Sequence, residues 1–102
     1  MSLRVRLTPE AQADLDEAQD WYDTASPGLG AEFLDAVEST LRLAADWPEA
    51  SPIVTEPMHR ALIPRFPYGV FYVVDGDELV VLGCIHMRRH PRVWKSRRRP
   101  PP

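Results

Sequence analysis

The order of the apolar patterns along the chain predicts an α+β fold, in which one strand is followed by two helices and then by three strands. Apolar residues alternate with polar ones near the N-terminus and again from His59, which is the period of strands. Between these regions they recur at helical spacing. The 102 residues suffice for one domain with a single core but leave no room for a cofactor-binding domain beside it.

The first strand is expected at residues 3–7, where every second side chain is apolar: Leu3, Val5 and Leu7. Thr8, Pro9 and Glu10 then predict a helix start, because Thr caps helices, Pro is tolerated at the first helical position and Glu suits the positive helix end. The apolar face of this helix would be formed by Ala11, Leu15, Ala18 and Tyr22. Most other positions are acidic, which predicts a negatively charged outer face.

A second helix is expected after residues 26–30, Ser-Pro-Gly-Leu-Gly, which break the first one. Its apolar residues recur at helical spacing: Phe33, Leu34, Val37, Leu41 and Ala44. Trp47 and Pro48 end this helix, and we expect Trp47 to lie as a lid on the core. Residues 48–57 contain three prolines and are predicted as a stiff loop. The two helices would form an antiparallel hairpin.

Three strands are predicted in the second half of the chain, at residues 59–63, 68–74 and 79–85. Residues 75–77, Asp-Gly-Asp, supply a tight turn between the last two. The last strand is apolar at nearly every position and should be a central strand of the sheet. We expect a short turn or helix around residues 92–97 and a frayed, basic and proline-rich tail at residues 98–102, so that residues 1–97 form the domain.

The net charge of −3 hides a strong asymmetry between the two halves of the chain. Residues 1–57 carry 3 Lys/Arg and 12 Asp/Glu, whereas residues 58–102 carry 9 and 3. Seven basic residues and no acidic one lie between Arg88 and Arg99. We expect the two halves to attract each other and the basic segment to face an anionic partner: a nucleic acid, an acidic protein segment or the chain's own helices.

Cysteine and histidine chemistry adds no predicted site. The single cysteine, Cys84, cannot form an internal disulfide and lies in an apolar run, so we interpret it as a core residue rather than a nucleophile. His59, His86 and His90 lack metal-ligand spacing with Cys84, so we expect no metal and no cofactor. Because no segment has the length of a signal peptide's apolar region or of a membrane span, we expect a cytoplasmic protein without membrane contact.

Several short motifs follow one another along the chain. They are Trp21-Tyr22, Pro27-Gly28-Leu29-Gly30 with Phe33, Pro48, Arg60, Arg65-Phe66-Pro67-Tyr68, and His86, Arg89, Pro91 and Trp94 in the spacing H-x-x-R-x-P-x-x-W. In this order, over residues 3–97, the chain resembles the RelE/ParE superfamily of type II toxins, in particular its ParE-like branch, often labelled plasmid stabilisation proteins. The resemblance implies a small, antiparallel-rich four-stranded sheet packed on an N-terminal helical hairpin, in the order β-α-α-β-β-β. It also implies a cognate antitoxin, encoded by an adjacent gene, whose flexible segment wraps the toxin.

Two targets are known in this superfamily, and the residues of the chain discriminate between them. ParE-like members poison DNA gyrase. RelE-like members cleave messenger RNA in the ribosome and resemble one another in using lysines and arginines of the sheet with a tyrosine near the C-terminus. Metal-independent RNA cleavage needs such cations and proton-transfer groups, but here the only lysine is Lys95 and no tyrosine follows Tyr72. We therefore expect a gyrase inhibitor rather than an enzyme, with DNA contacted only through the antitoxin.

Two alternatives remain open. A ribosome-dependent, metal-independent endoribonuclease would use Arg60, Arg65, His86 and Arg89, because histidines titrate near neutral pH and arginines bind phosphate. His86 ends a strand and His90 precedes a proline, however, and such positions are more typical of structural hydrogen bonding. The other alternative is a non-toxic relic that still binds the antitoxin.

Partner binding is expected at an exposed apolar and basic groove between the sheet and the helical hairpin. The candidate target- or antitoxin-binding residues are Arg60, Arg65, Arg88, Arg89, Arg92 and Trp94. Arg89 stands out because a guanidinium at a strand end makes bidentate contacts that lysine cannot reproduce. Arg97, Arg98 and Arg99 are expected to supply only diffuse, screened charge from the tail. Tyr22 and Trp94 are expected to pack in the core rather than stack on bases.

Overall fold

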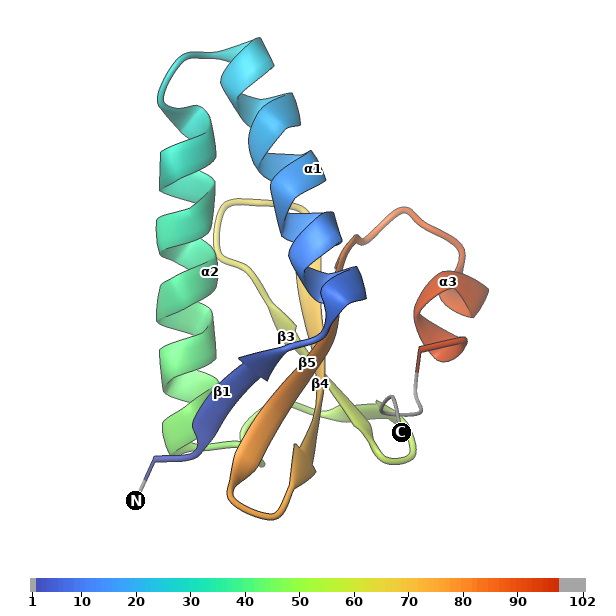
Figure 1. The fold of residues 1–102 in the computed structure, drawn as a ribbon. Helices are drawn as coiled ribbons and strands as arrows, with labels where there is room; N and C mark the ends of the chain where they lie inside the picture. The colour runs from blue at the N-terminus through green and yellow to red at the C-terminus, as the bar shows by residue number, and fades with distance from the viewer. Residues whose placement is uncertain (1, 98–102) are drawn as a thin grey trace.

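The computed structural model describes residues 2–97, in which a helical hairpin and a short terminal helix accompany one mixed sheet (Figure 1). The elements are β1 (Arg4–Leu7), α1 (Pro9–Ala25), α2 (Leu29–Asp46), β2 (Ile53–Thr55), β3 (Met58–Leu62), β4 (Tyr68–Asp75), β5 (Glu78–His86) and α3 (Pro91–Lys95). The predicted order of one strand, two helices and then strands is confirmed, with the additional strand β2 ahead of the three expected. The tail predicted at residues 98–102 lies outside the described residues.

The sheet has five strands rather than the predicted four, in the order β1-β5-β4-β3-β2. β1 pairs with β5 in parallel, and the other pairings are antiparallel. β5 therefore lies between two neighbours, as its apolar sequence predicts. The additional strand, β2, falls in residues 48–57, where the loop prediction is wrong in part. Its residues, Ile-Val-Thr, favour strands, and they pair with β3 at an edge of the sheet, where nearby prolines are tolerated.

The helical hairpin covers one face of the sheet (Figure 1). Thr8 caps α1 as predicted, because its hydroxyl accepts the Ala11 N–H at 3.1 Å. The residues predicted for the apolar face of α1 are all buried: Ala11, Leu15, Ala18 and Tyr22. On α2 the predicted stripe is buried at Phe33, Val37 and Ala44 and half-buried at Leu34 and Leu41. These side chains form the main core with residues of β4 and β5.

The turn between the helices depends on its glycines. Gly28 has a φ of 87°, a left-handed conformation that favours glycine. Gly30 lies against α1, where its N–H donates to Asp23 Oδ1 at 2.7 Å. A Cβ at Gly30 would come within 2.6 Å of the same carboxylate. The close approach ties the start of α2 to the last turns of α1 and so fixes the hairpin.

The prediction for Trp47 is wrong. α2 ends at Asp46, as the following Pro48 predicts, but the Trp47 side chain is 66% exposed instead of covering the core. Ala44 and Ala45 occupy the buried positions of the last turn, and Trp47 follows them outside the helix. The core is closed at this end by Tyr72, whose hydroxyl donates to the Pro48 carbonyl at 2.7 Å.

A second, smaller core lies on the sheet face away from the hairpin. It is built from Met58, Phe71, Val73, Val80, Leu82 and Ile85. Val93 and Trp94 of α3 pack against it, and the Trp94 ring stacks on Phe71 with centroids 5.0 Å apart. The short terminal helix is thus confirmed, and Trp94 packs as predicted. No helix among residues 2–97 combines the length and the apolar character that a membrane span requires.

Candidate functional site

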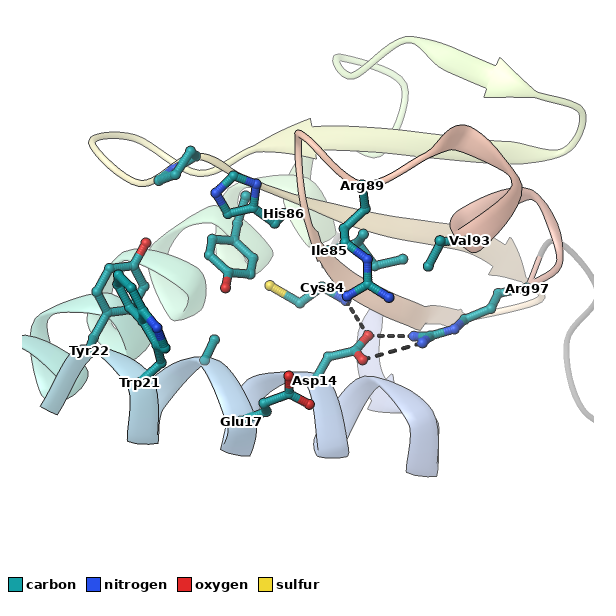
Figure 2. A pocket seen from close by; sticks show the side chains of 13 residues that line it. Asp14, Glu17, Trp21, Tyr22, Cys84, Ile85, His86, Arg89, Val93 and Arg97 are labelled. Atoms are coloured by element: carbon teal, nitrogen blue, oxygen red, sulfur yellow. Dashed lines mark hydrogen bonds and ion pairs between the residues drawn. The ribbon is translucent and has the colours of Figure 1, made fainter. Parts of the chain in front are cut away.

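An open pocket of about 710 Å³ lies between α1 and the segment that follows β5 (Figure 2). We call it the α1 pocket. Its volume is in the range of sites that hold a small ligand or the anchoring side chains of a peptide. It borders the sheet and one helix of the hairpin, where the groove is expected. The lining residues are Asp14, Glu17, Ala18, Trp21, Tyr22, Pro67, Tyr68, Cys84, Ile85, His86, Arg89, Val93 and Arg97.

Aromatic side chains form one end of the α1 pocket. Tyr22 of α1 and Tyr68 of β4 lie with ring centroids 6.1 Å apart, and Phe33 and Phe66 pack against them. Trp21 also lines the pocket, but its side chain is 64% exposed. Burial raises the pKa of Tyr22 and of Tyr68 above the ordinary value, so both phenols are neutral near pH 7. This end therefore offers uncharged aromatic surface beside an exposed indole.

β5 ends at the α1 pocket and presents two of the predicted candidates, His86 and Arg89. The His86 ring packs edge-on against Tyr68, with centroids 5.2 Å apart. Its Nδ1 accepts the backbone N–H of Arg88 at 3.0 Å, which is a structural hydrogen bond. Arg89 projects from the turn toward α1 (Figure 2). Within residues 2–97 it has no ion-pair partner, so its guanidinium is available to another molecule.

Asp14 and Arg97 close the other end of the α1 pocket. Both terminal nitrogens of Arg97 donate to the Asp14 carboxylate, with Nη2 at 3.3 Å from Oδ1. Asp14 Oδ2 also accepts the Cys84 N–H at 3.0 Å. The expectation that Arg97 supplies only diffuse charge from a tail is therefore wrong. In the sequence it is the first of three arginines before prolines, but in the structure its guanidinium reaches both the Asp14 carboxylate on α1 and the Leu82 carbonyl of β5.

Cys84 lines the pocket with a buried thiol. Its side chain is 3% exposed, as expected for a core residue. Burial, with a further contribution from the negative charge of Asp14, raises the pKa of the thiol to about 12. The thiol is therefore protonated near neutral pH. Among residues 2–97 no group of three or more His, Cys, Asp or Glu side chains is placed to hold a metal ion.

Two predicted arginines lie away from the α1 pocket. Arg60 pairs with Phe71 in the register of β3 and β4, which places it on the face of the second core. Its Nε is buried and has no hydrogen-bond partner in the described part of the chain. Arg65 lies in the loop between β3 and β4 with a φ of 70°, and its Nη1 is 3.9 Å from Glu32 of α2.

The remaining candidates also lie outside the pocket lining. Arg88 and Arg92 are exposed on either side of Arg89. Trp94 is half-buried in its stack on Phe71. The structure thus brings together His86 and Arg89, and it distributes the other candidates over the loop between β3 and β4, the opposite sheet face and the surface of the C-terminal segment.

Two acidic residues of the pocket have no counterpart among the predicted candidates. Asp14 and Glu17 lie one turn apart on α1, and their spacing predicts an acidic outer face and nothing more specific. The sequence feature that could have indicated this contact is the charge asymmetry between the two halves. The acidic α1 contacts the basic C-terminal segment at this pocket. The sequence does not show which carboxylate meets which arginine, because Asp14 and Arg97 are 83 residues apart.

Comparison with known proteins gives one family and a shared fold. The sequence matches the family model for the ParE toxin of the type II toxin–antitoxin system parDE over residues 5–91. A structure described as the chromosomal ParDE TA system from P. aeruginosa is 18% identical, with a TM-score of 0.74, covering 83% of this chain and 96% of that chain. A copper-bound mutant toxin from Helicobacter pylori is 22% identical, with a TM-score of 0.54, covering 82% of this chain and 93% of that chain. No functionally curated protein gives a significant match.

Proposed function

Because this chain belongs to the ParE toxin family of type II toxin–antitoxin systems, we propose that it inhibits DNA gyrase and that a cognate antitoxin, encoded by an adjacent gene, neutralises it. Gyrase acts on DNA in the cytoplasm, where this proposal places the protein. One observation favours gyrase over messenger RNA as the target. It is the distribution of the candidate nuclease residues over separate surfaces of the molecule.

RNA cleavage without a metal requires cations and proton-transfer groups that converge on one phosphate. Arg60 lies on the face of the second core, whereas His86 and Arg89 lie at the α1 pocket. Arg65 lies in a loop near Glu32 of α2. Of the four groups that a ribonuclease would need, two share the lining of the α1 pocket and two do not, which supports the inhibitor.

The charges of the α1 pocket also disfavour a polyanion. The Asp14 and Glu17 carboxylates lie on its α1 wall, and the cation at that end, Arg97, is already paired with Asp14. Arg89 is left as the unpaired arginine of the pocket within residues 2–97. With Asp14 and Arg97 paired, one guanidinium faces one remaining carboxylate, so the pocket carries no net positive charge for an RNA backbone.

The same pocket suits a segment of a protein partner. Exposed Trp21 and the neutral rings of Tyr22 and Tyr68 offer an anchor site for an apolar side chain. Arg89 offers a charge-assisted contact to a carboxylate of the same segment. An amphipathic, acidic segment of the antitoxin has both features, and it would bind as a helix in the groove or as an added strand. In this proposal the chain contacts DNA only through the antitoxin.

Induction of the toxin without its antitoxin separates the two targets. We expect cells to filament and to accumulate DNA damage while bulk messenger RNA stays intact, because gyrase poisoning breaks DNA and leaves transcripts unaffected. Mapping of transcript 5′ ends within minutes of induction measures this. Codon-positioned cleavage that disappears in His86→Ala or Arg89→Ala would favour the ribonuclease. Normal growth with intact transcripts and intact DNA would favour the non-toxic relic.

A further inference from the structure

We propose that Asp14 and Arg97 form a clasp that holds the C-terminal segment, residues 87–97, against α1 and β5 and thereby orients Arg89 in the α1 pocket. The positioning role toward a partner rests on the proposed function, in which the antitoxin occupies this pocket. The holding role does not depend on it. We call the pair the Asp14–Arg97 clasp.

The clasp occupies a gap in the sheet. β1 pairs with β5 only as far as Val81, where the Thr8 N–H donates to the Val81 carbonyl at 3.1 Å. Beyond that point the Cys84 N–H donates to Asp14 Oδ2 at 3.0 Å, and Arg97 Nη1 donates to the Leu82 carbonyl at 3.4 Å. One carboxylate and one guanidinium therefore provide the acceptor and the donor that a neighbouring strand would provide. Free backbone groups at a sheet edge invite pairing with another chain, and the clasp satisfies these two.

The space for the clasp is provided by Gly83. A Cβ at this position would lie 2.8 Å from Arg97 Nη1 and 3.2 Å from Asp14 Oδ2. The side chains of Arg97 and Asp14 are only 26% and 18% exposed, so the pair is largely enclosed. Closure costs the two charges part of their hydration, so we attribute the closed arrangement to the pair together with its hydrogen bonds to the Cys84 and Leu82 backbone groups.

The segment between β5 and the clasp has few other anchors. The Met87 N–H donates to the Pro67 carbonyl at 2.8 Å, which fixes the start of the turn. α3 has only five residues, and the preceding His90 caps it by accepting the Arg92 N–H at Nδ1. Trp94, stacked on Phe71, is its main contact with the sheet. Arg89 lies between the Met87 anchor and the anchors at Trp94 and Arg97, so its direction depends on both.

The two arginines of the segment differ in their ion pairing. Arg97 is paired with Asp14, whereas Arg89 lacks an ion-pair partner within residues 2–97 and points toward α1 (Figure 2). The match to the family model ends at residue 91, before Trp94 and Arg97. The clasp is thus assigned from the contacts of this chain and not from the family match.

Hydrogen exchange of the free protein tests the holding role. Arg97→Gln removes the charge, and Gly83→Ala displaces the guanidinium without changing any charge. Arg92→Gln is the matched control, because it removes one positive charge from the same segment at an exposed position. We expect the amides of residues 92–97 to exchange about tenfold faster in Arg97→Gln and Gly83→Ala, with wild-type rates in Arg92→Gln and unchanged protection in β4. Wild-type exchange in both clasp variants would overturn the proposal, whatever the antitoxin does.

Affinity for the purified product of the adjacent reading frame tests the positioning role. We expect Arg97→Gln to weaken binding about tenfold, and Arg97→Lys to restore part of the loss. In the Arg89→Ala background, Arg97→Gln should cause no further loss, because a positioning residue acts only through the group that it orients. Additive losses would contradict the positioning role. Failure of the wild-type chain to bind this product would contradict the proposed function instead, and the exchange measurement would then decide on the clasp alone.

Discussion

Arg89 and Arg97 lie on the same short segment. Arg97 forms an ion pair with Asp14, whereas Arg89 has no ion-pair partner within residues 2–97. Paired with Asp14 and hydrogen bonded to the Leu82 carbonyl, Arg97 is part of the structure of the domain. Arg89 has its guanidinium free at the α1 pocket. The H-x-x-R-x-P-x-x-W spacing singles out Arg89 in the sequence. Nothing comparable marks Arg97, because its partner lies on a helix at the other end of the chain.

Arg89 is expected to matter for toxicity and not for folding. Arg89→Ala should reduce toxicity sharply, whereas Arg89→Lys should reduce it partly, because an ammonium keeps the charge but not the bidentate geometry. Growth assays on induction measure toxicity, and thermal melts of the same variants measure folding. Lys95→Gln, which removes an exposed charge on α3, is the control and should stay toxic. Full toxicity of a folded Arg89→Ala protein would show that Arg89 does not take part in target binding.

Cys84 is expected to resist thiolate-specific reagents. Its folded pKa of about 12 lies above the ordinary value of 9.0, so the folded protein keeps the proton at a pH where the unfolded chain loses it. The contribution of this group to stability is therefore complete below pH 9 and declines as pH rises from there toward the folded pKa. We expect slow labelling by iodoacetamide at pH 8.5 without denaturant and fast labelling in denaturant. Equal rates under both conditions would contradict the burial of the thiol.

At the scale of elements, the predictions that depend on local chemistry are confirmed. The start of α1 follows from Thr8 and Pro9, and the buried faces of α1 and α2 follow from helical spacing. The sequence does not predict β2, because its three residues lie between Pro52 and Pro57, and prolines count against a strand; its pairing with β3 is nevertheless a local hairpin, in which Thr55 pairs with Met58. Trp47 is exposed because the small Ala44 and Ala45 fill the buried positions at the end of α2. The pocket forms where α1 lies beside the end of β5. Hydrophobic periodicity predicts each of these elements but not the contact between them.

The cap of α1 gives a quantitative test at this scale. Thr8→Ala removes the hydroxyl that accepts the Ala11 N–H and should lower the free energy of unfolding by about 1 kcal/mol. Thr8→Ser keeps the hydroxyl and should retain most of the stability. Urea unfolding monitored by circular dichroism measures both variants. Equal losses in the two variants would show that the buried methyl group, and not the cap, stabilises the start of α1.

At the scale of the whole molecule, the charge asymmetry of the sequence becomes a set of contacts between distant segments. Among residues 2–97, four of the five ion pairs join the two halves: Arg4–Asp77, Arg6–Glu78, Glu32–Arg65 and Asp14–Arg97. Two of them, Glu32–Arg65 and Asp14–Arg97, join an acid of the first half to a base of the second, in the direction that the asymmetry predicts. Exposed pairs contribute little to stability in water. The enclosed Asp14–Arg97 clasp differs from them because it also borders the pocket.

The fold class and the family follow from the sequence, whereas the arrangement of charged residues follows only from the structure. Arg60 and Arg89 are both candidates in the sequence, yet Arg60 lies on the face of the second core and Arg89 lines the α1 pocket. That separation supports an inhibitor of gyrase over a ribonuclease, since it leaves no convergent set of catalytic groups. An inhibitor needs no such set of catalytic groups, because it can bind its target protein through a single surface.

A supercoiling assay with purified gyrase and relaxed plasmid tests the gyrase proposal most directly. We expect the purified chain to inhibit supercoiling and to accumulate cleaved plasmid, and we expect the product of the adjacent reading frame to restore activity at equimolar amounts. The parallel assay supplies translating ribosomes with a defined messenger RNA, which should stay intact. Unimpaired supercoiling at a large excess of folded chain, together with cleavage of that messenger RNA, would contradict the proposal and identify the ribonuclease.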